Sequence, residues 1–120
     1  MDIIYNPTQE VVDDELMRLN TLREEYKEVY KELSQLDFEE AQEVNRVCNE
    51  LDDNGKKKFT YKNQAESFVQ EENIERTKRI NDLKISKKLL ELDDNTCEKN
   101  YYHWRNKILE NRQVDSEVSR

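Results

Sequence analysis

The sequence predicts an all-α protein, an antiparallel helical hairpin of the coiled-coil type. The 120 residues include one glycine, Gly55, and one proline, Pro7, and these are the two residue types that most often interrupt helices. Apolar residues also recur every three or four positions along two long stretches. The turn between these stretches is predicted at Asn54-Gly55, because this dipeptide readily adopts the positive φ angles of a tight turn or a helix C-cap. The alternative is a three- or four-helix bundle produced by kinks in the arms.

The composition is typical of helices that bury only a thin apolar seam. Hydrophobic residues make up 34% of the chain and charged residues 40%, whereas ordinary globular domains are roughly 45–50% apolar. Residues 1–54 hold 16 acidic and 5 basic residues (net −11), and residues 55–120 hold 12 acidic and 15 basic residues (net +3), which together give −8. Opposite charge favours pairing of the arms. Surface ion pairs are individually weak, so the seam must supply most of the stability.

We expect one helical domain, with Thr8 as the N-cap of the first arm and Thr60 as the N-cap of the second. The residues before Thr8 are predicted to form an extended leader, because Pro7 disfavours helix in the residue before it. The predicted boundaries are residues 1–112 for the domain, 8–53 for the first arm, 54–59 for the turn, 60–112 for the second arm and 113–120 for a frayed tail.

The first arm carries a heptad seam that changes phase near its middle. A capping box of Asp37 and Glu40 at the phase change predicts a kink or short break near Asp37. The alternative is a stutter inside one continuous helix. The first run comprises Val12, Leu19, Tyr26 and Leu33 with Leu22, Val29 and Leu36, and the second comprises Ala41, Val44, Cys48 and Leu51.

The second arm has one seven-residue track on which Arg76 is the only charged member. Three consecutive residues, Asp93, Asp94 and Asn95, have low helix propensity, so we expect a second kink near Asp94. If the hairpin closes at Asn54-Gly55, facing residues have numbers that sum to about 112. Cys48 and Cys97 would then lie too far apart for a disulfide. The apolar residues of the track are Val69, Leu83, Leu90, Cys97 and Trp104.

No catalytic, metal-binding or cofactor-binding pattern stands out, so we expect neither an enzyme nor a cofactor. His103 is the only histidine and the two cysteines are far apart in sequence, whereas metal sites need clustered ligands. A glycine-rich phosphate loop is also absent from the sequence. No stretch approaches the ~18 apolar residues of a membrane span, and no signal peptide is recognisable. We therefore expect a cytoplasmic protein with reduced thiols and no membrane attachment.

The acidic first arm suggests binding to a protein with a basic surface, because opposite charge steers association. Tyr102 and Arg105 are further candidates for partner binding, since Tyr and Arg are enriched in binding hot spots. The neighbouring Tyr101 and Trp104 are instead expected to close the end of the hairpin core. A thin seam also predicts a homodimer. The acidic candidates are Glu24, Glu25, Glu28 and Glu32.

Direct nucleic-acid binding is the alternative function, through two groups of basic residues that would contact phosphates. The net charge of −8 and the low isoelectric point oppose it, because a negative field repels nucleic acid at long range. The basic part of the second arm is instead expected to face the acidic first arm. A structural role in a coiled-coil assembly is a third hypothesis. The candidate phosphate contacts are Lys56, Lys57, Lys58, Arg79, Lys87 and Lys88.

Two features carry a resemblance to a known class of proteins. They are the predicted hairpin layout and a composition rich in Lys, Glu and Asn, as in the stretch NELDDNGKKKFTYKNQAESF. In this respect the chain resembles small coiled-coil proteins encoded by temperate phages and mobile elements of Gram-positive bacteria. Such proteins include accessory proteins of replication and recombination and inhibitors of host defence. The resemblance implies a protein-binding role in a bacterial host cytoplasm, for example as an inhibitor that covers the basic site of a nucleic-acid-binding defence protein. It transfers no individual site.

Overall fold

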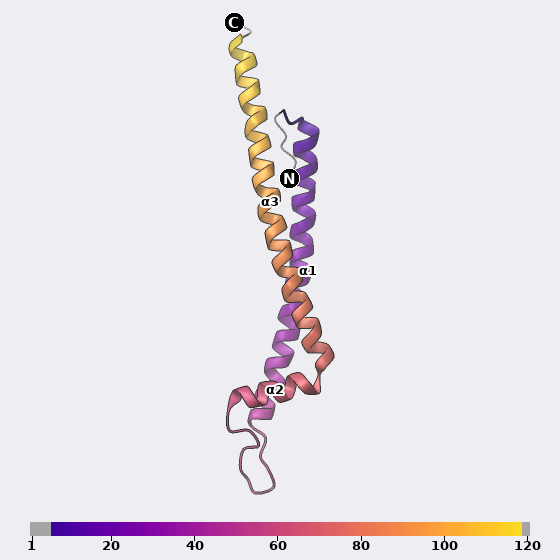
Figure 1. Cartoon of the computed structure of the whole chain (residues 1–120), viewed down its shortest axis with the longest axis vertical. Helices are drawn as coiled ribbons and strands as arrows, with labels where there is room; N and C mark the ends of the chain where they lie inside the picture. Colours follow the sequence, from indigo (N-terminus) through magenta and orange to yellow (C-terminus); the bar gives the residue numbers. More distant parts are fainter. Residues whose placement is uncertain (1–5, 119–120) are drawn as a thin grey trace. The chain divides into compact units, whose positions relative to one another are not determined.

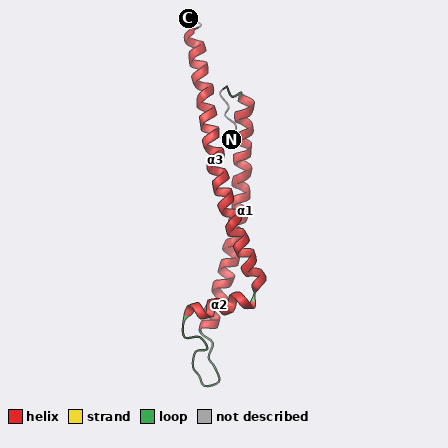
Figure 2. Ribbon diagram, viewed as in Figure 1, coloured by secondary structure: helices red, strands yellow, loops and turns green. Residues whose placement is uncertain are grey.

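Three α-helices account for most of residues 6–118, the part of the chain that the computed structural model describes. Helix α1 spans Gln9–Cys48, α2 spans Lys62–Glu72 and α3 spans Ile74–Val118 (Figure 1). The other described residues form loops and turns, with one isolated antiparallel bridge between Leu51 and Lys57 (Figure 2). The predicted all-α hairpin class is confirmed.

Helix α1 begins directly after the predicted cap and is one continuous helix up to Cys48. The Thr8 hydroxyl accepts a hydrogen bond from the Val11 amide at 3.3 Å, and the Thr8 carbonyl accepts one from the Val12 amide at 3.2 Å. The helix continues without interruption past Asp37, so a break there is excluded, and the alternative of a kink near Asp37 stays a prediction. The change of phase is a stutter that one helix absorbs, since neither glycine nor proline interrupts it. Helix α1 ends at Cys48, before the predicted end of the first arm.

The loop after α1 contains the predicted tight turn at Asn54-Gly55. The Asp52 carboxylate accepts hydrogen bonds from the amides of Asn54 at 2.9 Å and Lys56 at 3.0 Å. The Asp52 amide donates to the Lys56 carbonyl at 2.6 Å. Gly55 has a φ of +76°, in the left-handed region that glycine enters without a steric penalty. The glycine therefore serves a turn inside the loop and not a helix C-cap.

Asn73 divides the second arm into two helices, where the sequence predicted one. Its amide donates to the Val69 carbonyl at 3.1 Å and closes α2. Its side-chain oxygen accepts the Arg76 amide at 3.1 Å and caps α3. Asparagine is among the preferred residues at a helix N-cap, so one residue ends one helix and begins the next.

The start of α2 and the length of α3 also differ from the predictions. Tyr61, not Thr60, is the N-cap of α2, and its amide donates to the Gln64 side chain at 3.3 Å. Helix α3 is continuous through Asp94, so no break divides the helix there, and the kink near Asp94 stays a prediction. It also extends to Val118 and includes residues that were expected to fray. An ion pair of 3.0 Å between Arg23 and Asp94 helps to hold this stretch in place.

The described chain forms two compact units, and each contains parts of α1 and α3. In the first unit, residues 9–27 of α1 run antiparallel to the part of α3 that begins at residue 88 (Figure 1). Glu15 contacts Cys97 and Tyr26 contacts Glu91. The numbers of Glu15 and Cys97 sum to 112, which confirms the predicted register. The buried apolar residues of this unit are Val12, Leu19, Cys97 and Trp104.

The second unit, residues 28–87, contains two clusters of buried apolar side chains. The first cluster joins α1 to α3, and Glu32 pairs with Arg79 close to the same register. The second cluster joins the end of α1 to α2 and includes Val47, which the predicted seam omits. The first cluster comprises Leu33, Ile80 and Leu83, and the second comprises Val44, Val47, Ala65 and Val69.

Candidate functional site

The acidic candidates lie on successive turns of α1 but differ in their partners. The Glu32 carboxylate accepts two hydrogen bonds of 2.8 Å from Arg79, and these bonds lower the pKa of Glu32. Glu24 pairs with Lys27 on the same helix at 3.1 Å. Glu25 and Glu28 are exposed, and no ion pair to either is formed by the residues that the structure describes. Glu32 is therefore occupied within the hairpin, while Glu25 and Glu28 face solvent.

Three of the six candidate phosphate contacts lie on α3, and two of them already have partners. Arg79 holds Glu32, as described above, and the hydrogen bonds between them raise the pKa of Arg79. The Lys87 ammonium lies 5.5 Å from the centroid of the Tyr30 ring, a distance suited to a cation–π interaction. Lys88 is exposed. The sequence prediction that the basic stretch faces acidic residues of the first arm is thus confirmed for Arg79.

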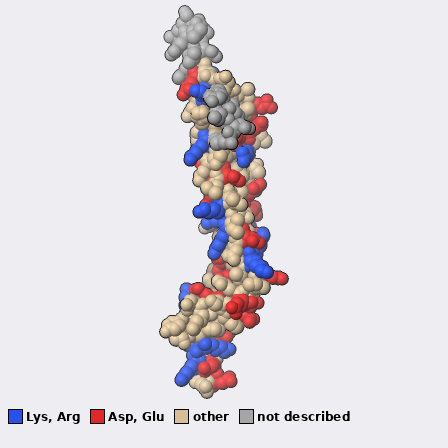
Figure 3. All heavy atoms as spheres, in the orientation of Figure 1, with Lys and Arg blue, Asp and Glu red and all other residues tan. Residues whose placement is uncertain are grey.

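The other three candidate phosphate contacts lie on the loop between α1 and α2. Lys56, Lys57 and Lys58 are all exposed. The Lys58 ammonium lies 3.4 Å from the Glu50 carboxylate, which is also 2.7 Å from Arg46. Figure 3 shows lysine or arginine atoms over this loop together with some acidic atoms, and an area of uncharged residues beside them.

The aromatic cluster near the end of α3 divides between core and surface. Trp104 is buried and Tyr101 is half-buried, as expected for residues that close the seam. The Tyr102 side chain is 49% exposed, and its ring centroid lies 5.2 Å from that of Tyr101. Arg105 and His103 are exposed. Tyr102 and Arg105 are therefore available to a partner.

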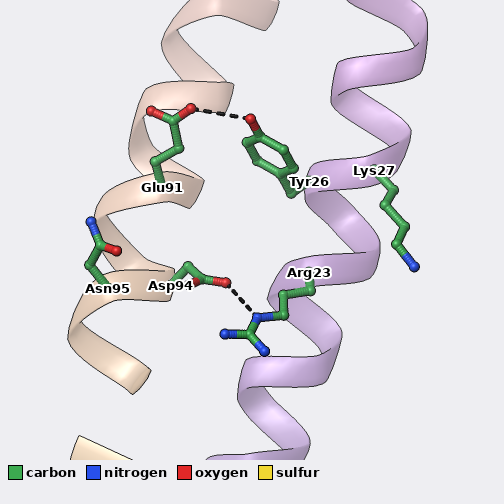
Figure 4. A pocket seen from close by; sticks show the side chains of 6 residues that line it. All are labelled: Arg23, Tyr26, Lys27, Glu91, Asp94 and Asn95. Atoms are coloured by element: carbon green, nitrogen blue, oxygen red, sulfur yellow. Dashed lines mark hydrogen bonds and ion pairs between the residues drawn. The ribbon is translucent and has the colours of Figure 1, made fainter. Parts of the chain in front are cut away.

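A pocket of about 490 Å³ lies between α1 and α3 in the first unit (Figure 4). Arg23 reaches across it to Asp94 at 3.0 Å and to Glu98 at 3.5 Å, and the hydrogen bond to Asp94 raises the pKa of Arg23. The Tyr26 hydroxyl donates to Glu91 at 3.2 Å. These interactions cross the pocket and connect the two helices. Because they pair opposite charges, the pocket does not present a concentrated charge to a ligand. The remaining lining residues are Lys27 and Asn95.

Arg76, the charged residue on the apolar track, is buried and paired. Its side chain is 7% exposed and donates two hydrogen bonds to the Glu43 carboxylate, at 3.0 and 2.8 Å. These bonds lower the pKa of Glu43 and raise that of Arg76. The Arg76 Nε atom is buried without a hydrogen-bond partner among the described residues. A planar guanidinium with a bidentate carboxylate suits such a site, so Arg76 is part of the core of the second unit, while the Glu43 side chain is 39% exposed at its edge.

Cys97 and Glu15 form a second buried polar pair, in the first unit. The Cys97 thiol donates to the Glu15 carboxylate at 2.7 Å and lies 3.3 Å from the Glu15 carbonyl. Burial and the hydrogen bond to Glu15 raise the pKa of Cys97 to about 12. Both cysteines are free thiols. A thiol with so high a pKa is unreactive at neutral pH, so Cys97 is suited to packing and not to catalysis.

Sequence reasoning missed Glu15 and Asn73, although each left a signal. Glu15 lies three residues after Val12 and four before Leu19, so helical spacing places it on the seam. Asn73 is followed by Glu75 in the first turn of α3, as is common at helix starts. The pocket had no such signal, because it depends on which residues of α1 and α3 face each other.

Comparisons with known proteins add no family to this description. No protein-family model matches the chain, and neither a curated protein nor a solved structure matches it. Among the described residues, no group of three His, Cys, Asp or Glu side chains is arranged to hold a metal ion. None of the helices described here has the length and apolar character needed to cross a membrane.

Proposed function

We propose that this chain is a non-enzymatic protein-interaction module that binds a partner with a basic surface through exposed carboxylates of α1. The observation that carries this proposal is the solvent exposure of Glu25 and Glu28, which lie three residues apart on one helix. Glu24 adds a third carboxylate, shared with Lys27. Carboxylates that are not neutralised within the hairpin are free to attract cationic side chains of another protein and to speed their association.

The resemblance to phage and mobile-element proteins extends this proposal to an inhibitor. Such a module would cover a basic, nucleic-acid-binding site on a host protein, for example a defence protein, in the cytoplasm of a bacterium. Tyr102 and Arg105 supply a second contact area with the residue types of binding hot spots.

We also propose that the module is a homodimer. Leu89 and Leu92 are more than half exposed and lie three residues apart on α3, so they share one face that a second copy would cover. Light scattering over a range of protein concentrations distinguishes a dimer from a monomer. Large oligomers would instead favour a role in a structural assembly.

The experiment is affinity capture from a bacterial lysate, with mass-spectrometric identification of the retained proteins and titration of the recovered partner. We expect the Glu25→Gln/Glu28→Gln variant to bind it more weakly. Each exposed ion pair contributes about 0.2–1 kcal/mol, so two lost pairs weaken binding roughly two- to thirtyfold. Glu32 is left unchanged, because its loss would release Arg79 inside the hairpin.

The matched control is the Glu71→Gln/Asp93→Asn variant, which removes two exposed carboxylates from α2 and α3. It has the same net charge as the test variant and should keep the affinity of the unmodified chain. Equal weakening in both variants would show that only net charge matters, and an unchanged affinity of the Glu25→Gln/Glu28→Gln variant would exclude the α1 carboxylates as the binding site.

A further inference from the structure

The loop between α1 and α2 and the start of α2 combine lysines with one largely exposed aromatic ring, an arrangement that the proposed acidic surface does not use. We name residues 56–62 the lysine–aromatic loop. Its four lysines are all exposed, and Tyr61 is 66% exposed. A second partly exposed ring, Phe68, lies on α2. The four lysines are Lys56, Lys57, Lys58 and Lys62.

The aromatic residues of this loop are anchored by contacts to the buried cluster and to α2. Phe59 packs against the cluster that includes Val44 and Val47. The Phe59 and Phe68 ring centroids are 5.2 Å apart. The backbone of Tyr61 is tied to α2, because its amide donates to Gln64. The Tyr61 ring is therefore presented to solvent from an anchored position.

Two acidic residues next to the loop, Glu50 and Asp52, are committed to other partners, whereas Asp53 is exposed. Glu50 lies 2.7 Å from Arg46 and 3.4 Å from Lys58. The Asp52 carboxylate accepts two backbone amides of the turn. No ion pair to Lys56 or Lys57 is formed by any residue from 6 to 112, so these two ammonium groups remain available for an external anion.

We propose that the lysine–aromatic loop binds single-stranded nucleic acid. Lysines on a flexible stem contact backbone phosphates, and exposed aromatic rings stack on unpaired bases, which together form the usual chemistry of single-strand binding. In Figure 3 an area without charged residues lies next to the basic atoms of this loop. Of the other three candidate phosphate contacts, Arg79 and Lys87 already have partners within the hairpin, and Lys88 is exposed on α3, outside this loop.

A single strand fits this surface better than a duplex or a membrane does. Base stacking on Tyr61 requires a base that is not already stacked in a double helix. Membrane insertion requires an apolar face of substantial area, whereas Phe59 is occupied in the core and Tyr61 is the loop's one largely exposed ring. Anionic vesicles are therefore the competing ligand in the test.

The test is fluorescence anisotropy with a labelled single-stranded oligothymidylate, a duplex of equal length and vesicles containing phosphatidylserine. The unmodified chain should bind the single strand at low salt and prefer it to both other ligands. Each phosphate contact changes the slope of log K against log salt by about −0.7, so two or three lysines predict a slope of roughly −1.4 to −2.

Two sets of variants separate the phosphate contacts from stacking. Lys56→Gln/Lys57→Gln/Lys58→Gln should abolish binding and its salt dependence, whereas the matched variant Lys31→Gln/Lys84→Gln/Lys99→Gln, at three exposed lysines outside the loop, should bind normally. Tyr61→Ala should weaken binding roughly tenfold with an unchanged salt slope, and Tyr61→Phe should retain it. Circular dichroism checks that each variant remains helical.

The outcomes are distinct from those of the acidic-surface proposal, because Glu25→Gln/Glu28→Gln should leave oligonucleotide binding intact. No binding of the single strand at low salt would overturn the proposal. Normal binding by the loop-lysine variant, equal binding of the duplex, or binding of the vesicles alone would overturn it as well.

Discussion

Two charged side chains, Glu15 and Arg76, are buried in the seam between helices, one in each unit. Each is satisfied by a partner distant in sequence: Glu15 by the Cys97 thiol and Arg76 by the Glu43 carboxylate. A buried polar group without its partner is costly. Sliding one helix along the other would separate both pairs, so we infer that these residues help to specify the register in addition to the apolar contacts.

The Cys97–Glu15 pair predicts a large difference in reactivity between the two thiols. With a pKa of about 12, Cys97 has a thiolate fraction near 10⁻⁴ at pH 8. In single-cysteine variants, we expect the Cys97 thiol of Cys48→Ser to react with a maleimide at least ~100-fold more slowly than the Cys48 thiol of Cys97→Ser. The half-buried Cys48 is the accessible reference. Both variants should react at one rate in denaturant, and equal rates in the native state would contradict the buried pair.

At the scale of helices, periodicity was more informative than local capping signals. The spacing of Val12, Leu19 and Leu33 correctly predicted three buried positions of α1. The acidic residues at Asp37 and Asp94 suggested helix ends, yet both lie inside continuous helices. A cap contributes only about 1 kcal/mol, which packing on both sides of such a residue outweighs. The break at Asn73 lay in a polar stretch where the seam is weak, so periodicity carried no signal there.

We predict that the Asn73 side chain stabilises the junction of α2 and α3. Replacing it with Ala removes the oxygen that accepts the Arg76 amide, and this loss should lower the free energy of unfolding by about 1 kcal/mol. Asn73→Asp keeps a capping oxygen and should lose much less. Asn81→Ala is the control, because Asn81 is an exposed residue inside α3 where alanine favours helix. Urea unfolding measures all three, and a midpoint for Asn73→Ala equal to that of Asn81→Ala would rule out the cap.

For the molecule as a whole, the division of charge between the arms predicted the ion pairs of only one unit. In the second unit, acidic residues of α1 pair with basic residues of α3, as in Glu32 with Arg79. In the first unit the order is reversed, because Arg23 of α1 pairs with Asp94 and Glu98 of α3. Net charge describes an arm on average, whereas ion pairing depends on the few residues beside the seam. The same limit explains why the pocket at Arg23 was not predicted, and why the sequence did not separate Glu25 and Glu28 from the occupied Glu32.

The unequal cores of the two units predict unequal protection from hydrogen exchange. The second unit has seven buried apolar residues in the described chain, whereas the first has four together with the polar Glu15. Since each fully buried large apolar side chain contributes about 1.5–3 kcal/mol, amides in residues 29–36 and 78–84 should exchange at least ~10-fold more slowly than those in 12–19 and 95–104. Exchange followed by mass spectrometry gives these rates peptide by peptide.

A variant in the larger core tests the cause of that difference. Leu83→Ala removes a buried side chain of the second unit and should cost about 2–5 kcal/mol. It should therefore accelerate exchange in residues 29–36 and 78–84 and narrow the gap between the units. Uniform protection along α1 and α3 in the unmodified chain would mean that both units open in one cooperative step, whatever the difference in their cores. An unchanged gap in the variant would show that buried apolar area is not what sets the local stability.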